Sequence, residues 1–358
     1  MRGRQKTGGA RTLPGEVKKR PPKNPPPLAD GFRSPAAAGS PMVCNAATGR
    51  AKTANAMPAR YRLSPDGPEF SRIAYGTWRL MEGAHGPAEI LDRFKACVDA
   101  GVTTIDTAEI YGLYAVEEAI GNALALEPSF RSRIEIATKC GIYLPCPAFP
   151  SVRSHHYDAT AARIVESAEK SLRLLRTDRI DLLMVHRPDW FTAADETAEG
   201  LNSLLRSGKV LAVGASNFNT HQVELLNSRL DRPLAVNQIE FSLLHTDPME
   251  DGTLDQCQRL RIHPMAWSPL GGGRLFAGGD PAAGRLQKAA AELSGKYGGA
   301  SLDQLACAWV LAHPSRPVAV IGTNNTARIQ AAAAASGIEL GREDFFALWS
   351  AAKGRPIP

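Results

Sequence analysis

IDLLMVHRPDWFTAADETAEGLNSLLRSGKVLAVGAS, residues 180–216, contains two short apolar runs separated by a segment with helical spacing. The runs 180–186 and 210–216 are rich in Val, Ile and Leu, as expected of strands that are buried on both faces. Residues 196–208 repeat apolar side chains at three- and four-residue intervals, which is typical of an amphipathic helix. The order strand, helix, strand predicts two parallel strands joined by a helical crossover.

The same alternation recurs throughout residues 58–358. Eight strand-like runs occupy residues 72–77, 103–108, 134–139, 180–186, 210–216, 234–240, 264–270 and 318–323. Helical spacing appears between them, for example at 87–101, 158–176, 220–230 and 301–314. Eight repeats favour a closed (β/α)8 TIM barrel over an open doubly wound sheet, and no G-x-G-x-x-G follows the first run. We predict one α/β domain over residues 58–358, closed by a helix within 342–358.

Residues 1–57 differ in composition from the rest of the chain. They contain eleven Lys or Arg against two acidic residues, together with Pro- and Ala-rich stretches, and they lack apolar periodicity. We expect this basic extension to be disordered, because it cannot bury enough apolar surface to offset its conformational entropy. Three interpretations of the extension are a natural basic arm, a targeting segment, and translation from a start upstream of the natural one. We favour the last, with Met57 as the natural start.

Charge, cysteine content and hydropathy restrict the class of protein. The net charge is +6 and the extension carries +9, so residues 58–358 carry −3, which argues against nucleic acid as a partner. The six cysteines form no CxxC pair and no zinc spacing. No apolar run is long enough to span a membrane, and no secretory signal is present. We expect a soluble cytoplasmic protein without a membrane partner; the sequence leaves its oligomeric state open and is compatible with a monomer.

Polar residues end the apolar runs. In a parallel barrel the carboxyl ends of all strands meet at one face, so these side chains are expected to converge on one pocket. In chain order they are Asp106, Tyr111, Lys139, His186, Ser216, Asn217 and Gln238. Each alone has a structural explanation, such as a helix cap, a packed ring or a core histidine. Their joint position at consecutive strand ends predicts a functional site.

Four of these residues suit proton transfer to a carbonyl. A phenol has a pKa of about 10, and a neighbouring ammonium lowers it by stabilising the phenolate. Lys139 is expected to do this for Tyr111, while Asp106 keeps the lysine charged and fixed. His186 would then donate a hydrogen bond to the carbonyl oxygen of a substrate or relay a proton to the phenol.

Seven strings in order resemble the aldo-keto reductase family, and in particular its bacterial oxidoreductase branch. They are DTAEIYG, ATKCG, MVHRPD, GASNF, VNQIE, WSPLGGGRL and IGTNNTARI, beginning at residues 106, 137, 184, 214, 236, 267 and 321. The resemblance extends from about residue 60 to Pro358. It implies that Asp106, Tyr111, Lys139 and His186 form a catalytic tetrad in which Tyr111 is the general acid of reduction.

The resemblance also implies a nicotinamide cofactor. Ser216, Asn217 and Gln238 would bind its carboxamide, and Trp267 would stack on the ring where the family usually has Tyr. The further cofactor contacts implied are Gly76, Thr77, Asp106, Ser268, Leu270, Gly271, Gly273, Arg274, Gly322, Thr323, Asn324 and Arg328. NADPH is the expected cofactor, because Thr323 and Arg328 suit a 2′-phosphate; Asn324 replaces a common cation, which leaves NADH possible.

The expected ligand is a small-molecule carbonyl compound. The resemblance places the walls of the substrate pocket in loops after the strands, so Trp78 and Tyr143 join Tyr111 and His186 as candidate substrate contacts. The loop 144–157 also contains His155 and His156, but a pair without a third ligand does not predict a metal site.

Three functions are compatible with these residues. The leading one is NADPH-dependent reduction of aldehydes or ketones to alcohols. A second is a regulatory subunit that binds nicotinamide as a redox sensor without turnover. The third is an aldolase that forms a Schiff base on Lys139, although this function leaves Tyr111 and the string GASNF unexplained.

Overall fold

The structure, a computed structural model, describes residues 60–83 and 86–358. The predictions for residues 1–57, namely disorder and a natural start at Met57, lie outside the described residues. In the part of the chain that is described, no helix is both long and apolar enough to cross a membrane.

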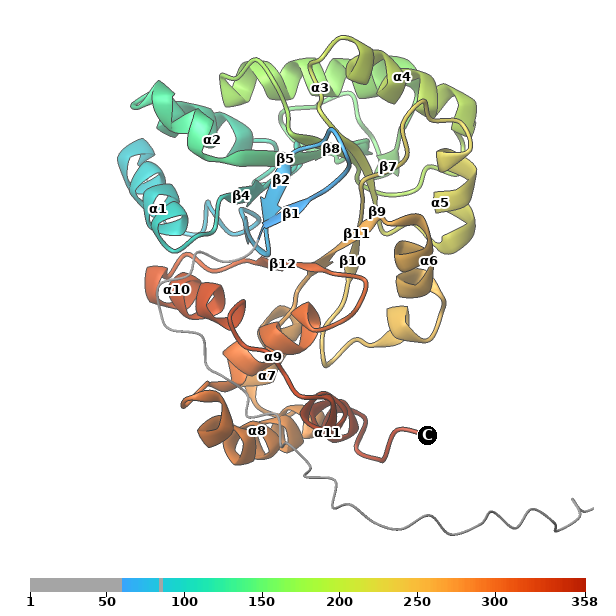
Figure 1. Ribbon diagram of the computed structural model, residues 1–358. Coiled ribbons are helices and arrows are strands. Elements are labelled where there is room, and N and C mark those ends of the chain that lie inside the picture. The colour runs from blue at the N-terminus through green and yellow to red at the C-terminus, as the bar shows by residue number, and fades with distance from the viewer. Residues whose placement is uncertain (1–59, 84–85) are drawn as a thin grey trace, which may run out of the picture. The chain divides into compact units, whose positions relative to one another are not determined.

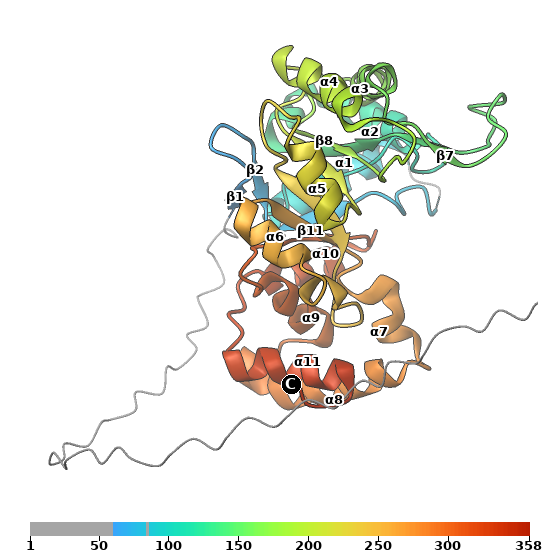
Figure 2. The same ribbon diagram turned by 90° about the vertical axis from the view of Figure 1, so that its right-hand side faces the viewer.

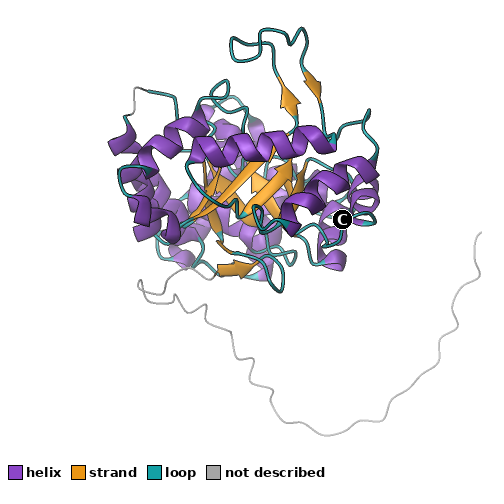
Figure 3. Ribbon diagram, turned by 90° about the horizontal axis from the view of Figure 1, so that it is seen from above, coloured by secondary structure: helices purple, strands orange, loops and turns teal. Residues whose placement is uncertain are grey.

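Eight parallel strands close into a barrel, which confirms the predicted fold (Figures 1 and 3). The strands are β3 (Ile73–Gly76), β4 (Thr104–Asp106), β5 (Glu135–Cys140), β8 (Leu182–Val185), β9 (Val213–Ser216), β10 (Val236–Glu240), β11 (His263–Trp267) and β12 (Val318–Ile321). Their order around the barrel is β10, β11, β12, β3, β4, β5, β8 and β9. Each of the eight predicted runs overlaps a barrel strand; β5 ends and β11 begins one residue outside its run.

Helices surround the barrel and connect its strands. Those between consecutive strands are α1 (Pro87–Asp99), α2 (Val116–Leu124), α3 (Ala161–Leu175), α4 (Ala194–Arg206), α5 (Thr220–Asn227), α6 (Thr253–Leu260) and α9 (Leu302–Leu311). After β12 come α10 (Thr326–Ala335) and the predicted closing helix α11 (Arg342–Lys353). Two helices not predicted from the sequence, α7 (Arg274–Ala277) and α8 (Pro281–Ser294), lie between β11 and α9, and α8 packs against α11.

Strand alternation divides the core into an inner and an outer part. Ala74, Ala137 and Met184 belong to a cluster that fills the barrel interior, because successive strand side chains point to opposite faces. Their neighbours Ile73 and Leu183 belong to two other clusters, which pack the strands against the surrounding helices. The same alternation determines which residue at each strand end faces the interior of the barrel.

A hairpin of β1 (Arg60–Arg62) and β2 (Glu69–Ser71) lies at the amino ends of the strands. Tyr61, Leu63 and Phe70 belong to the cluster of the barrel interior, and Tyr61 stacks on His263 at the start of β11. A second hairpin, β6 (Ile142–Tyr143) with β7 (His156–Tyr157), follows β5. Figure 2 shows the two hairpins on opposite sides of the barrel, so the amino ends are covered by one and the carboxyl ends adjoin the other.

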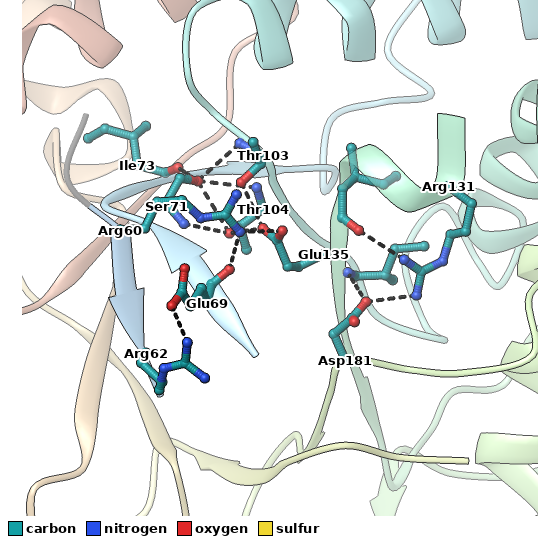
Figure 4. Close-up of polar contacts among 12 residues, drawn as sticks. Arg60, Arg62, Glu69, Ser71, Ile73, Thr103, Thr104, Arg131, Glu135 and Asp181 are labelled. Carbon is teal, nitrogen blue, oxygen red and sulfur yellow. Dashed lines mark hydrogen bonds and ion pairs between the residues drawn. The ribbon is translucent and has the colours of Figure 1, made fainter. Parts of the chain in front are cut away.

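Buried polar groups tie the amino ends of β3, β4, β5 and β8 together (Figure 4). The Ser71 hydroxyl donates to the carbonyl of Ile73 and accepts from the amides of Thr103 and Thr104. Arg131 donates to the Asp181 carboxylate at 2.7 Å, and the same oxygen accepts the amide of Ile136 at 2.8 Å. These contacts join neighbouring strands at the face opposite the predicted site.

A buried carboxyl group lies between α2, β5 and α3. Glu117 is 1% exposed and accepts hydrogen bonds from the hydroxyls of Thr138, at 2.6 Å, and Ser171, at 2.9 Å. Both donors are neutral, so they compensate only in part for the lost hydration of a carboxylate. Burial raises the pKa of Glu117 from its ordinary value of 4.5 to about 7.

Glu117→Gln is expected to stabilise the protein above neutral pH. Because the folded-state pKa exceeds the unfolded one, the stability that protonated Glu117 contributes is fully present below pH 4.5 and is lost as the pH rises through about 7. At pH 8 the variant should exceed the wild type by about 3 kcal/mol in unfolding free energy, and at pH 4 by nothing. Urea unfolding across this range measures the effect. The exposed neighbour provides the control Glu118→Gln, and equal pH profiles for wild type and Glu117→Gln would contradict the prediction.

Candidate active site

A cavity of about 1020 Å³ opens at the carboxyl ends of the barrel strands. It brings together most of the residues predicted to form the site, from seven of the eight strand ends or the loops beyond them; β5 contributes none. Those that line it are Gly76, Trp78, Asp106, Tyr111, His186, Ser216, Asn217, Gln238, Trp267, Ser268, Leu270, Gly273, Gly322, Thr323, Asn324 and Arg328. The predicted convergence of strand ends is therefore present in the structure.

Lys139 lies behind the wall of this cavity and is completely buried. Its ammonium group donates to both carboxylate oxygens of Asp106 at 2.9 Å and to the carbonyl of Thr107 at 2.8 Å. Burial alone would lower the pKa of Lys139, but the Asp106 carboxylate and the Tyr111 phenol outweigh it, and the pKa is raised. The lysine therefore carries its charge, and its position is fixed by hydrogen bonds.

Tyr111 is the third member of this cluster. Its hydroxyl lies 3.1 Å from the Lys139 ammonium, and its ring is 8% exposed to the cavity. Burial raises the pKa of the Tyr111 phenol, and the Lys139 charge acts in the opposite direction. The expected effect of Lys139, which lowers the pKa of Tyr111, is present, but lost hydration outweighs it and the pKa is raised overall.

The turn between β4 and α2 holds Tyr111 in place. The amide of Glu109 donates to the Lys139 carbonyl at 3.1 Å, and the Glu109 carboxylate accepts from the Gly141 amide and from Arg163. Gly112 has a φ of 57°, and a Cβ there would lie 3.0 Å from Val116. A residue with a side chain would strain this turn, so glycine at 112 keeps the preceding phenol at the lysine.

His186 ends β8 and faces the same cavity. Its ring centroid lies 6.0 Å from that of Tyr111, and its backbone amide donates to the Cys140 carbonyl at 2.9 Å. Burial, and then the charges of Lys139 and Arg187, hold the pKa of His186 well below its usual range. The imidazole is therefore neutral. Its buried Nδ1 has no hydrogen-bond partner within the described residues.

An amide and hydroxyl cluster lies at the ends of β9, β10 and β11. Asn217 has a φ of 59°, and its side-chain nitrogen donates to the Ser216 hydroxyl at 2.8 Å. The Trp267 indole donates to the Asn217 side-chain oxygen at 3.0 Å, and Gln238 donates to Asp106 at 2.8 Å. These bonds fix a set of polar groups beside an indole ring, next to the buried Asp106–Lys139 pair.

The loop after β11 adds a stretch of exposed backbone to the cavity. Ser268 and the three glycines 271–273 all have positive φ values, between 51° and 95°. At Gly271 a Cβ would approach Leu244 to 2.8 Å, so this position requires glycine. Gly272 and Gly273 line the cavity, so backbone rather than side chains faces it there, and the Gly273 N–H donates to the Leu270 carbonyl at 3.1 Å.

The end of β12 supplies the polar groups farthest along the chain. The Asn324 side chain accepts from the Tyr75 hydroxyl at 2.8 Å and donates to the Arg79 carbonyl at 2.7 Å. It thereby holds the loop after β3 against the end of β12. The side chain of Arg328 is exposed, lines the cavity, and makes no hydrogen bond or ion pair with the described residues.

Five of the predicted contacts are not among the lining residues. Lys139 acts from behind Asp106 and Tyr111, and the buried Thr77 hydroxyl donates to the Asp106 carbonyl. Gly271 packs on Leu244, and the Arg274 guanidinium turns back to the Gly271 carbonyl. Tyr143 is a correction: its ring lies in β6 against the Arg163 guanidinium, at 4.3 Å, and against His156. The structure does not bring Tyr143 to the cavity as a substrate contact.

Several lining residues were not predicted. They are Arg79, Glu82, Arg187, Pro269, Gly272, Phe276, Asp303, Cys307, Val320, Ile321 and Ala332. Arg187 could have been predicted to line the cavity, because it directly follows His186 at a strand end. Phe276 and Asp303 belong to helices α7 and α9, and the sequence offers no local sign that these helices approach the strand ends.

The family model described as "Aldo/keto reductase family" matches residues 72–353. The 6-dehydroglucose reductase of Agrobacterium fabrum is 46% identical over 290 residues, covering 81% of this chain and 96% of that protein. The oxidoreductase YdhF of Escherichia coli is 43% identical over 302 residues, covering 84% and 100%. An aldo-keto reductase from Klebsiella pneumoniae, solved in complex with NADPH, is 28% identical with a TM-score of 0.65, covering 81% and 93%.

A (β/α)8 barrel with a buried Asp–Lys–Tyr cluster at its strand ends is the expected architecture of such an oxidoreductase. The chain belongs to the aldo/keto reductase family. The resemblance inferred from its seven sequence strings is thereby confirmed.

Proposed function

We propose that this protein reduces aldehyde and ketone carbonyls to alcohols with NADPH, and that Tyr111 is the general acid. The observation that carries the proposal is the Lys139 ammonium, which binds both Asp106 and the Tyr111 hydroxyl at the wall of the cavity. A phenol in contact with a buried cation is suited to giving up a proton to a substrate oxygen.

The cavity fits a nicotinamide dinucleotide. Ser216, Asn217 and Gln238 offer fixed polar groups for the carboxamide, and Trp267 offers a flat ring for the nicotinamide. The backbone of the glycine loop suits the pyrophosphate, and Arg328 suits a 2′-phosphate. The Klebsiella relative solved with NADPH supports this choice. When bound, the cofactor supplies the hydride that is added to the carbonyl carbon.

The protein residues handle the proton that the carbonyl oxygen acquires. Because burial raises the pKa of Tyr111, the phenol keeps its proton until a substrate oxygen becomes basic. The O–H bond of Tyr111 then breaks, the proton forms the new alcohol O–H, and the phenolate is stabilised by the Lys139 ammonium. His186 is neutral and donates an N–H to the same oxygen, which polarises the carbonyl without repelling the lysine.

The two other functions predict different behaviour of the same residues. A Schiff-base aldolase needs an accessible amine, whereas Lys139 is completely buried and its ammonium group is engaged by Asp106, Thr107 and Tyr111. A redox sensor would bind NADPH without turnover, and no observation on the described residues favours it over catalysis.

The proposal is tested by measuring NADPH binding through its fluorescence and NADPH consumption with a panel of aldehydes, ketones and dicarbonyls. We expect saturable binding and oxidation of NADPH with at least one class of carbonyl. Binding without any turnover would contradict the reductase and support the sensor, and absence of binding would contradict both.

The substrates are expected to include hydroxylated aldehydes. Two relatives, at 46% and 39% identity, are named 6-dehydroglucose reductase, and that name denotes a sugar oxidised at C6. The lining of the cavity combines aromatic side chains with arginine and amide donors, which suits a chain of hydroxylated carbons.

Arg328→Gln is expected to weaken NADPH binding by roughly tenfold to a hundredfold, which is the usual effect of losing a charge-assisted hydrogen bond. NADH lacks the 2′-phosphate, so its dissociation constant should not change. Fluorescence titration with both cofactors measures the difference. Arg342→Gln, an exposed arginine in α11, is the matched control, and equal losses for NADPH and NADH would contradict the assignment.

A further inference from the structure

Arg187 is a half-buried cation that faces the cavity without a counter-charge. It directly follows His186, and its guanidinium makes no hydrogen bond or ion pair with the part of the chain that the structure describes. The neighbouring cations differ in this respect: Arg79 lies 3.7 Å from Glu82, and Lys139 is bound to Asp106. A guanidinium has five N–H groups, all of them donors. Those of Arg187 have no acceptor oxygen among the described residues.

The position of Arg187 in the barrel separates it from the phosphate-binding residues. Arg187 follows β8, whereas Thr323 and Arg328 follow β12, and these two strands are four apart in both directions around the eight-stranded barrel. They therefore lie on opposite sides of the barrel. The phosphates expected at the glycine loop and at Arg328 would not serve as the partner of Arg187.

Two members of the tetrad, Lys139 and His186, belong to β5 and to the end of β8, on the side of the barrel where Arg187 lies; Asp106 and Tyr111 follow β4, midway between β8 and β12. The positive charge of Arg187 contributes to lowering the pKa of His186 and opposes the burial-induced rise in the pKa of Tyr111. Arg187 also lines the same cavity as Tyr111 and directly follows His186, so its side chain faces the space in which the substrate is expected to bind.

Trp78 completes this part of the cavity. Its side chain is 62% exposed, and its ring meets Tyr111 edge-on, with the centroids 5.0 Å apart. An exposed indole face suits the C–H face of a carbohydrate, because carbohydrates present apolar C–H bonds on one side and hydroxyls around the rim. The indole for the C–H bonds thus lies against Tyr111, in the same cavity that Arg187 lines.

We propose that Arg187 is a specificity-determining residue that donates hydrogen bonds to hydroxyl oxygens on the carbons next to the reacting carbonyl. This inference rests on the proposed function, and it narrows the substrate class to hydroxylated aldehydes. An aldehyde without hydroxyls would cover Arg187 without satisfying its N–H groups. Sites built to hydrogen-bond a substrate discriminate strongly against analogues that lack the bonding group.

The test compares two aldehydes of equal carbon number, glyceraldehyde and propanal. The wild type should prefer glyceraldehyde. Arg187→Gln should lower kcat/KM for glyceraldehyde by roughly tenfold to a hundredfold, mainly through KM, and change that for propanal by less than about threefold. Arg187→Lys should recover only part of the preference, because an ammonium lacks the fork of donors. Arg153→Gln, in the exposed loop between β6 and β7, is the matched control.

Three outcomes would overturn the assignment. Equal losses for both aldehydes, accompanied by a shifted pH profile, would mean that Arg187 acts through the charges of Tyr111 and His186. If the wild type reduced propanal as efficiently as glyceraldehyde, there would be no preference for hydroxylated aldehydes for Arg187 to determine. A selective loss with succinic semialdehyde, while glyceraldehyde is unaffected, would identify a carboxylate as the ligand.

A binding measurement keeps this inference separate from the proposed function. D-Glucose, the alcohol that corresponds to 6-dehydroglucose, is titrated into the protein–NADP⁺ complex by calorimetry. Arg187→Gln should weaken this binding by roughly tenfold or more while leaving NADP⁺ binding unchanged. If no aldehyde is turned over, the proposed function fails, but a weakened D-glucose affinity still supports Arg187 as the hydroxyl-binding residue. Equal D-glucose affinity in the two proteins, or no binding to either, would overturn it.

Discussion

Tyr111→Phe is expected to lower kcat for carbonyl reduction by about a thousandfold while leaving the dissociation constant of NADPH unchanged. Among the described residues, the phenol is the only proton-bearing group that is hydrogen-bonded to the Lys139 ammonium. Removing a positioned general acid generally costs a factor of about 10² to 10⁴. NADPH affinity should be retained, because most of the residues expected to hold the cofactor lie at the ends of β9 to β12 and Tyr111 is not among them.

The pH dependence of the reaction rate provides a second test of Tyr111 as the general acid. Reduction requires the protonated phenol, and burial raises the pKa of Tyr111, so reduction should persist well into the alkaline range. Alcohol oxidation requires the phenolate and should increase as the pH rises. Stopped-flow measurement of both directions, with wild type and variant, separates the chemical step from cofactor release.

Tyr157→Phe provides a control that removes a phenol from β7, outside the cavity. It should reduce carbonyls at the wild-type rate. If Tyr111→Phe retained more than about a tenth of the wild-type kcat, the proton would have to come from His186 or from water, and Tyr111 would be a positioning residue instead.

The tetrad was predictable because its geometry follows from strand order and alternation. Asp106, Lys139 and His186 stand at the ends of consecutive strands β4, β5 and β8, and such ends meet in any parallel barrel. On β5, side chains alternate between the two faces of the strand, so Ala137 and Lys139 both point into the barrel. A lysine buried there requires an acidic partner inside the barrel, and that partner is Asp106. No long-range packing had to be known to infer that pair.

Features that depend on long-range packing were not predictable. Tyr143 was expected at the cavity, but the short β6–β7 hairpin turns its ring toward Arg163, whose own position is fixed by Glu109. The side chain of Asn324 was assigned to the cofactor from its place in the chain. Asn324 lines the cavity, but its hydrogen bonds to Tyr75 and the Arg79 carbonyl, which are distant in sequence, were not predicted. Loop residues lack the fixed period that strand residues have.

Lys139→Met is expected to abolish reduction and, unlike Tyr111→Phe, to destabilise the fold. Asp106 is 2% exposed and its carboxylate would lose a charged donor to both oxygens; within the described residues it would keep only the bond from Gln238. Removing one partner of a buried ion pair typically costs about 3 to 5 kcal/mol. Without the ammonium, the phenolate left by proton transfer is also unstabilised, so kcat should fall by at least about a hundredfold.

The double variant Lys139→Met/Asp106→Asn separates these two effects. A neutral amide at 106 no longer requires a counter-charge, so the double variant should recover a large part of the lost stability, as measured by urea unfolding. It should not recover turnover, because the phenol still lacks its cation. If the single variant were as stable as the wild type, Asp106 would have to be protonated or hydrated in it. If the double variant reduced carbonyls as fast as the wild type, the charge on Lys139 would have no part in the transfer of the proton from Tyr111.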